Sequence, residues 1–207
     1  MGKPIINRKH KICIVCEGDE EEQYIISLRN LALWPDYDVK TANAHGAGSI
    51  SAKFQDKVSS DSYEAVLIFC DTDKYPFDQY AIVKQKLMNI LGKNAKLDKF
   101  IIFANPCSMQ IVLLHFCEDV ILHTQSKTEN ASVIALHTGV ANYKAHFKQI
   151  LAICQQIHRP NYALMKDRIE KLSKDETITP STNIGRFLAF LEAPDTDWIR
   201  EIKKQYD

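Results

Sequence analysis

The chain has 207 residues, with 26 acidic and 26 basic side chains and a hydrophobic fraction of 45%. This length is enough for one domain with a sizeable core, or for a domain with an appendage. Because the charges balance, no global field attracts nucleic acid, so a nucleic-acid role requires a local basic patch or a partner. We find neither a signal-peptide core nor an apolar stretch long enough to span a bilayer, so we expect a cytoplasmic protein without a membrane partner.

Strand-like apolar runs alternate with helical spacing in the first part of the chain. The pattern predicts strands at residues 11–16, 37–42, 65–70 and 100–104. It predicts helices at 19–33, 50–60 and from about Pro76 to 91. Regular alternation of this kind indicates an α/β fold with a parallel, doubly wound sheet flanked by helices.

The later part of the chain is predicted to be helical. Asn105 and Pro106 are interpreted as an N-cap and a first helical residue, opening an apolar helix that continues to Phe116. Beyond residue 123 we expect no strand, and further helices are predicted at 140–157, 160–173, 182–192 and 195–205, with 130–139 left open. Residues 179–182 are interpreted as the start signal of the third of these helices. The predicted organisation is an α/β core at 1–122 with a helical C-terminal region at 123–207 packed on it.

Carboxylates follow two of the predicted strands at the point where each strand ends. Glu17 follows the first strand, and Asp71 and Asp73 follow the third. In open parallel sheets, ligands bind beyond the carboxyl ends of the strands, so these side chains converge if the two strands are neighbours. Two carboxylates about 4 Å apart repel by roughly 4 kcal/mol at an effective dielectric near 20. A divalent cation such as Mg2+ relieves this repulsion with oxygen ligands of the same kind.

Each acidic cluster also has a plainer interpretation. Asp71 and Asp73 also fit the start of a turn, where Asp is favoured. A carboxylate beside a helix start is favoured by the helix dipole, and we assign this role mainly to residues 19–22, with Glu20 the least certain of the four. Glu17 precedes the turn, where a ligand at a strand end is expected.

Other polar residues have weaker functional interpretations. Cys13 and Cys16 resemble a redox pair, but within a strand residues three apart point to opposite faces, so we expect buried thiols instead. His115 lies within the apolar helix, and we expect a partly buried histidine hydrogen-bonded to backbone rather than a metal ligand or base. Residues 45–49 offer a weak phosphate-loop pattern before a helix. The candidate phosphate-binding cations are Lys74 and Arg168, although the charged stretch around Arg168 also fits a solvated helix face.

Several segments together resemble a known family. Residues 14–18 (Ile-Val-Cys-Glu-Gly) and 69–73 (Phe-Cys-Asp-Thr-Asp) resemble the motifs of the Toprim domain, the acidic metal-binding module of primases, topoisomerases and several nucleases. Asn105-Pro106-Cys107 with the helix that carries His115 resembles the Asn-Pro-Cys helix of RloB-like proteins. Residues 166–170 and 180–183 are similar to two later segments of that family. The matches come in family order and span nearly the whole chain.

The RloB-like resemblance implies a Toprim-like fold, Mg2+ or Mn2+ at the acidic site and a role in prokaryotic restriction or abortive infection, that is, in phage defence. Carried over by motif, Asp71 and Asp73 are the metal-binding pair, and Glu17 is a ligand or handles a proton. One position departs from the family pattern, because Met109 stands where an acid is usual. If that acid helps to hold the cation, this chain binds it weakly or not at all; alternatively, Met109 only packs the helix.

Two main functional hypotheses follow. The leading one is a Mg2+-dependent nuclease that hydrolyses phosphodiester bonds in DNA or RNA. The alternative is a catalytically degenerate Toprim-fold module that binds nucleic acid or a partner protein of a defence complex. A phosphotransferase with Asp71 as nucleophile ranks last, because the haloacid-dehalogenase pattern places that residue after the first strand rather than the third.

Overall fold

The computed structural model describes residues 8–72, 78–116, 119–193 and 195–206. Four strands of the sheet and the first helices come in alternation: β1 (His10–Cys16), α1 (Asp19–Asn30), β2 (Tyr37–Asn43), η1 (Ala47–Ser49), α2 (Ile50–Ser59), β3 (Ala65–Asp71), α3 (Gln79–Leu91), η2 (Leu97–Lys99) and β4 (Ile101–Asn105). The remaining elements are α4 (Met109–Leu113), α5 (Lys127–Thr138), α6 (Tyr143–Lys171), β5 (Ser181–Thr182), α7 (Ile184–Glu192) and α8 (Asp197–Lys203).

The sheet has five strands in the order β2-β1-β3-β4-β5. The first four strands are parallel, and β5 pairs with β4 in the antiparallel direction. Strands β1 and β3 are apolar almost throughout because helices cover both faces of the sheet, which is typical of parallel sheets. The predicted α/β class with a mostly parallel sheet flanked by helices is confirmed, and the architecture is consistent with a Toprim-like fold.

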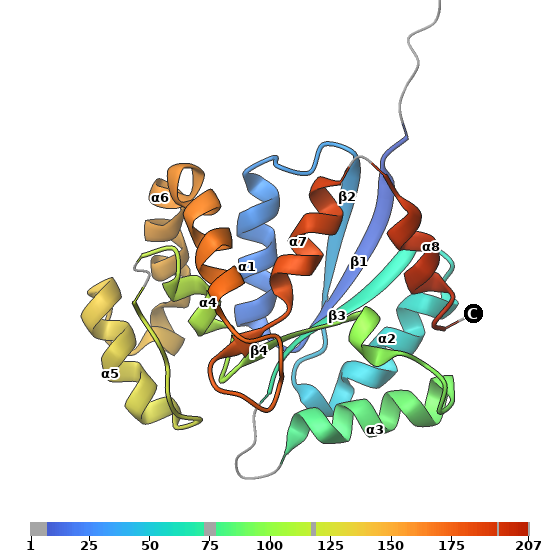
Figure 1. Cartoon of the computed structure of the whole chain (residues 1–207), viewed down its shortest axis with the longest axis horizontal. Helices are drawn as coiled ribbons and strands as arrows, with labels where there is room; N and C mark the ends of the chain where they lie inside the picture. The colour runs from blue at the N-terminus through green and yellow to red at the C-terminus, as the bar shows by residue number, and fades with distance from the viewer. Residues whose placement is uncertain (1–7, 73–77, 117–118, 194, 207) are drawn as a thin grey trace, which may run out of the picture.

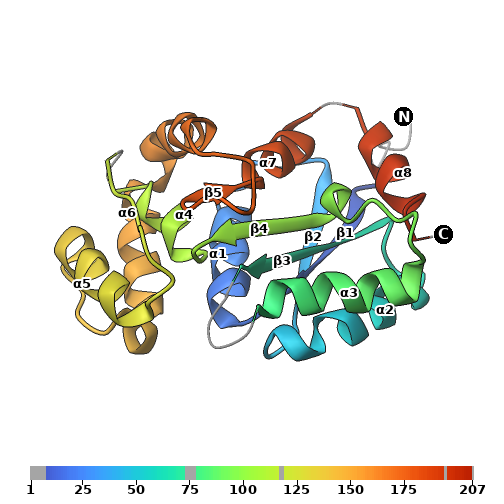
Figure 2. The same cartoon turned by 60° about the horizontal axis from the view of Figure 1, so that its bottom comes forward.

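The helices form two layers around the sheet (Figures 1 and 2). Helices α2 and α3 lie side by side on one face, α1 and α7 cover the other face, and α6 packs against α1 and α7. Helix α8 lies near the amino-terminal ends of the strands, where Trp198 donates a hydrogen bond to the Tyr37 hydroxyl. At the opposite end of the sheet, the carboxyl ends of the parallel strands point toward α5 and α6 (Figure 2).

The C-terminal region differs from its prediction in two respects. A strand is present, because β5 joins the edge of the sheet, so the predicted boundary at 122/123 does not separate sheet from helices. The two helices predicted at 140–157 and 160–173 form the single helix α6, which has a kink at His146, where the backbone dihedral angles are not helical. The apolar positions Ile150, Met165 and Ile169 are fully buried, and this packing holds the long helix together.

The prediction that Asn105 caps a helix is wrong. Asn105 is the last residue of β4 and is fully buried, and α4 begins only at Met109, after Ser108. The Asn105 side chain instead donates hydrogen bonds to the carbonyl oxygens of Glu176 and Ile178, at 3.0 and 2.8 Å. An asparagine that donates hydrogen bonds to backbone carbonyls far away in the chain has the same local sequence pattern as an N-cap. The pattern alone therefore does not distinguish these two roles.

The chain contains no helix, within the described residues, that is long and apolar enough to cross a membrane.

The cysteines of the sheet behave as small buried apolar residues. Cys13, Cys16 and Cys70 are free thiols with at most 1% exposure. Burial raises the pKa of the Cys13 thiol to about 12 and that of Cys70 well above its usual range. The thiolate is the reactive form, so these groups are held in their unreactive state.

We therefore expect Cys13, Cys16 and Cys70 to resist alkylation in the native protein at about pH 8, because burial keeps them protonated. Mass spectrometry after treatment with iodoacetamide will locate the labelled cysteines. The same treatment in guanidinium chloride is the control, and all three should then react. Rapid native labelling of Cys16 would contradict a buried strand position for this pair.

Candidate functional site

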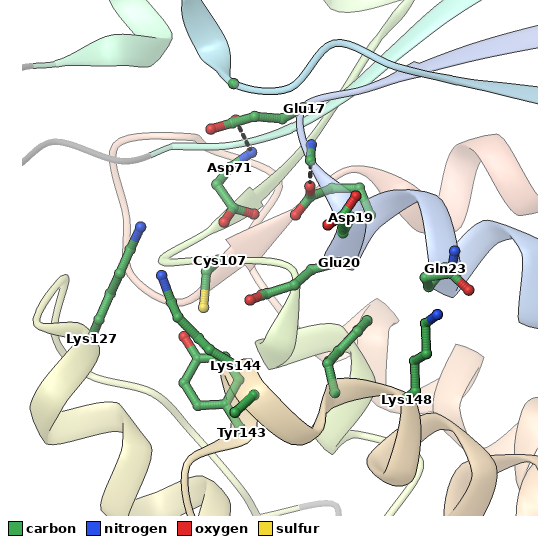
Figure 3. A pocket seen from close by; sticks show the side chains of 15 residues that line it. Glu17, Asp19, Glu20, Gln23, Asp71, Cys107, Lys127, Tyr143, Lys144 and Lys148 are labelled. Atoms are coloured by element: carbon green, nitrogen blue, oxygen red, sulfur yellow. Dashed lines mark hydrogen bonds between the residues drawn. The ribbon is translucent and has the colours of Figure 1, made fainter.

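Glu17 and Asp71 meet at the carboxyl ends of two neighbouring strands. Strands β1 and β3 are paired in parallel with Cys16 opposite Phe69, and the Glu17 backbone N–H donates to the Phe69 carbonyl at 2.9 Å. The Asp71 backbone N–H donates to Glu17 Oε2 at 3.1 Å, as Figure 3 shows. The strand order reverses between β1 and β3, because the chain moves outward to β2 and then returns to the other side of β1. Ligands of open α/β sheets bind at such a switch point.

Asp71 also fixes the start of helix α4. Its Oδ1 accepts a hydrogen bond from the Ser108 backbone N–H at 2.7 Å, so the carboxylate satisfies one of the unpaired N–H groups of that helix end. The side chain is thereby held between β3 and α4. Two other candidates, Asp73 and Lys74, lie outside the described residues.

Glu21 has a different environment from the one expected for a helix-start carboxylate in solvent. It is only 4% exposed and lines the pocket at the strand ends, beside Asp71. Its Oε2 accepts the Gly18 backbone N–H at 2.9 Å, which completes the turn between β1 and α1. Burial raises the pKa of the Glu21 carboxyl above its usual range. Sequence reasoning missed this residue because the helix dipole explains an acid in the first turn equally well.

A pocket of about 600 Å³ lies beyond the two strand ends. One side is acidic and includes Glu17, Asp19, Glu20, Glu21 and Asp71. The other side is formed by α5 and α6 and carries three lysines, which we call the lysine wall: Lys127, Lys144 and Lys148. Figure 3 shows the side chains of the lysine wall extending toward the acidic side. The pocket thus presents carboxylates and ammonium groups to the same space.

The lysine wall was not predicted from the sequence. Lys144 and Lys148 are four residues apart, which places them on one face of a helix, and this spacing was the available signal. Nothing local indicates that this face turns toward the acidic strand ends, because that placement depends on how α6 packs against the rest of the fold.

The remaining predicted residues lie away from the lining of the pocket, with one exception. Cys107 lines the pocket and is 6% exposed. His115 is fully buried and its Nε2 lies 2.9 Å from the Tyr24 hydroxyl, so at least one of its partners is a side chain. Arg168 donates from Nη1 to the Leu114 carbonyl at 2.7 Å, an interaction that satisfies the C-terminal end of α4.

Met109 is fully buried and is not part of the pocket lining. The structure therefore places it in the core, in agreement with the interpretation that it packs the helix. An acid at this position of the chain would enter the hydrophobic core rather than complete the acidic side of the pocket.

The site fits a divalent cation in part. Carboxylate oxygens are the ligands that Mg2+ prefers, and Glu17 and Asp71 supply them from two adjacent strand ends. Thr72 Oγ1, next to Asp71 in the chain, is buried and has no hydrogen-bond partner among the described residues. Within the described ranges, no group of three His, Cys, Asp or Glu side chains is arranged to hold a metal ion. Glu17 and Asp71 thus provide half of a cation site.

Comparison of the chain with protein-family models, curated proteins and solved structures gave no match. The RloB-like resemblance therefore stays a prediction from short motifs, and the likeness to a Toprim fold rests on the order and direction of the strands.

Proposed function

We propose that this protein is a metal-dependent nuclease that hydrolyses phosphodiester bonds, with Mg2+ or Mn2+ as its cofactor. The observation that carries the proposal is the meeting of Glu17 and Asp71 at the β1/β3 switch point, opposite the lysine wall. A phosphodiester is an anion that needs charge neutralisation when a nucleophile attacks it. A cation held by the carboxylates and the ammonium groups of the wall would supply that charge from two sides.

Glu17 and Asp71 would hold the cation, with Asp73 as the third ligand that the family resemblance implies. When bound, the cation would act as a Lewis acid on the phosphoryl group and lower the pKa of a water molecule. Glu17 is oriented by the Asp71 N–H, and it would serve either as a ligand or as the general base. Asp71 is oriented by the Ser108 N–H, which fixes one of its oxygens and limits its rotation.

The biological setting belongs to the same proposal. The motif resemblance supports an RloB-like protein of a prokaryotic restriction or abortive-infection system, with DNA or RNA as the substrate. A partner protein of a defence complex would control when cleavage occurs.

A binding module without catalysis is the second candidate. It is favoured by the balanced net charge of the chain, which gives no global attraction for a polynucleotide substrate. Isothermal titration calorimetry with Mn2+ discriminates between the two candidates. Binding that disappears in Asp71→Ala favours the nuclease, whereas no binding to the wild-type protein favours the module.

Removal of the metal is the direct test of catalysis. We expect the purified protein to cleave labelled DNA or RNA with Mg2+ or Mn2+ and to lose this activity in EDTA, because the carboxylates need the cation to approach a phosphate. Glu17→Gln should reduce the rate by about 10²-fold or more, as a ligand or general base contributes. Gel electrophoresis of the products measures both effects. Failure to cleave any substrate, or equal cleavage in EDTA, would contradict the proposal.

A further inference from the structure

A second hollow on the protein surface adjoins the pocket at the strand ends. This hollow has a volume of about 210 Å³ and lies between α1 and α6, where it is lined in part by Ser27, Asn30 and Leu151. The two hollows share Gln23 and Lys148 in their linings. Figure 3 shows Gln23 and Lys148 across from each other beyond Glu20. The two adjoining hollows, which we together call the α1–α6 groove, extend from Asp71 past Lys148 to Asn30.

Cations line this path on the α6 side. Lys144 and Lys148 are exposed, and neither forms an ion pair within 4 Å with any described carboxylate, so their charge is available to a ligand. The two lysines follow one another along one helix face, whereas amide side chains from α1 line the opposite side at Gln23 and Asn30. A row of cations facing hydrogen-bonding groups matches a ligand with repeated negative charges and polar groups between them.

We propose that the α1–α6 groove binds a single polynucleotide strand, with one phosphate near Lys144 beside the acidic strand ends and a following phosphate near Lys148. The inference rests on the proposed function, because this strand would be the substrate of the carboxylate site. It narrows the substrate class from nucleic acid in general to a single-stranded segment of DNA or RNA.

The dimensions of the groove support a strand over the other phosphate ligands. The pocket volume of about 600 Å³ is within the range of pockets that hold small molecules, roughly 300–1,000 Å³. The pocket therefore accommodates one or two nucleotides. A duplex would have to bring several base pairs to Asp71 at once, and these would not fit in this volume. A mononucleotide would fill the pocket but would not use the continuation past Lys148, whereas a strand uses both.

Fluorescence anisotropy with labelled oligonucleotides of about 15 nucleotides tests this inference. Binding is measured in EDTA and again with Ca2+. Because Mg2+ is absent in both conditions, the affinity is measured separately from Mg2+-dependent cleavage. The wild-type protein should bind a single strand at least about tenfold more tightly than the duplex of the same sequence. DNA and RNA strands form separate arms of the experiment, and a mononucleotide serves as competitor.

The double variant Lys144→Glu/Lys148→Glu should weaken strand binding by about tenfold or more and reduce the magnitude of the salt slope by about 1.4, since each phosphate contact of a single strand contributes about 0.7. The matched control is Lys93→Glu/Lys96→Glu, which reverses two exposed lysines near the amino-terminal end of β4 and gives the same change in net charge. Thermal unfolding of both variants shows that they are folded, and the milder Lys148→Ala should weaken binding in the same direction.

The outcomes separate the inference from the proposed function. Equal weakening in the two double variants, tighter binding of the duplex, or binding of the mononucleotide without the strand would overturn the groove assignment. If the protein cleaves nucleic acid but the lysine substitutions do not weaken strand binding, the groove assignment is overturned and the nuclease proposal remains. Lysine-dependent strand binding without any Mg2+-dependent cleavage would support the groove and reject the nuclease.

Discussion

Replacement of Asp71 by asparagine is expected to reduce Mg2+-dependent cleavage by at least about 10²-fold, because even outer-shell partners of metal ligands contribute 10–100-fold. The free energy of unfolding should stay close to that of the wild type. Asparagine retains an Oδ1 atom that accepts the Ser108 N–H, so the start of α4 keeps its partner while the negative charge is lost. Initial cleavage rates on a labelled strand and urea unfolding curves measure the two quantities on the same preparation.

Two further variants make this prediction specific. Asp71→Ala removes both the charge and the acceptor, so it should lose activity and also be less stable by about 1–3 kcal/mol, the cost of an unpaired buried N–H group. Asp36→Asn removes the charge of an exposed aspartate near the amino-terminal end of β2 and should change neither quantity. Wild-type cleavage rates in Asp71→Asn would show that this carboxylate takes no part in catalysis.

The convergence of Glu17 and Asp71 was predictable because it depends on local patterns and one general rule. Each residue follows an apolar run whose length and composition predict a strand, and the alternation with helices makes these strands parallel. The carboxyl ends of parallel strands lie at the same edge of the sheet. Only the adjacency of β1 and β3 had to come from the structure, and it decides that the two side chains meet.

The opposite side of the pocket was not predictable in the same way. Lys144 lies on a helix that the sequence predicts, whereas Lys127 begins α5, most of which lies in the segment that the sequence left open. In neither case does the sequence show which surface the helix covers. Their approach to the strand ends is set by the packing of α5 and α6, which involves contacts between residues far apart in the chain. Glu21 was misassigned for a related reason, because burial of a first-turn acid is a tertiary property that its helix position does not reveal.

The two-residue strand β5 shows a further limit of sequence reasoning. Ser181 and Thr182 are too few to produce a strand pattern, and they pair with the end of β4 only because the preceding loop is held in place. Asn105 makes the contacts that hold this loop, through its bonds to the carbonyls of Glu176 and Ile178. The residue misread as a helix cap thus connects the sheet with the C-terminal region.

Asn105→Ala is therefore expected to destabilise the protein by about 3 kcal/mol, which corresponds to a Tm decrease of about 6–12 °C for a chain of this size. The carbonyls of Glu176 and Ile178 lose their donor, and Gln125 Nε2 and Thr179 Oγ1 lose the Asn105 Oδ1 acceptor, at 2.7 and 3.1 Å. An unpaired buried group costs about 1–3 kcal/mol, and we take a value below the sum of four such costs because these groups are only partly buried. Differential scanning calorimetry measures the change.

The pattern of stability among related variants tests the physical reason. Asn105→Asp keeps the shape and the acceptor but points a carboxylate at two carbonyl oxygens, so it should be at least as destabilising as alanine. Asn94→Ala, at an exposed position after α3, should change the unfolding free energy by no more than about 0.5 kcal/mol. Asp71→Asn should lose activity at an unchanged Tm, whereas Asn105→Ala should lose stability. A Tm for Asn105→Ala within about 2 °C of the wild type would mean that the loop holds its position without this side chain.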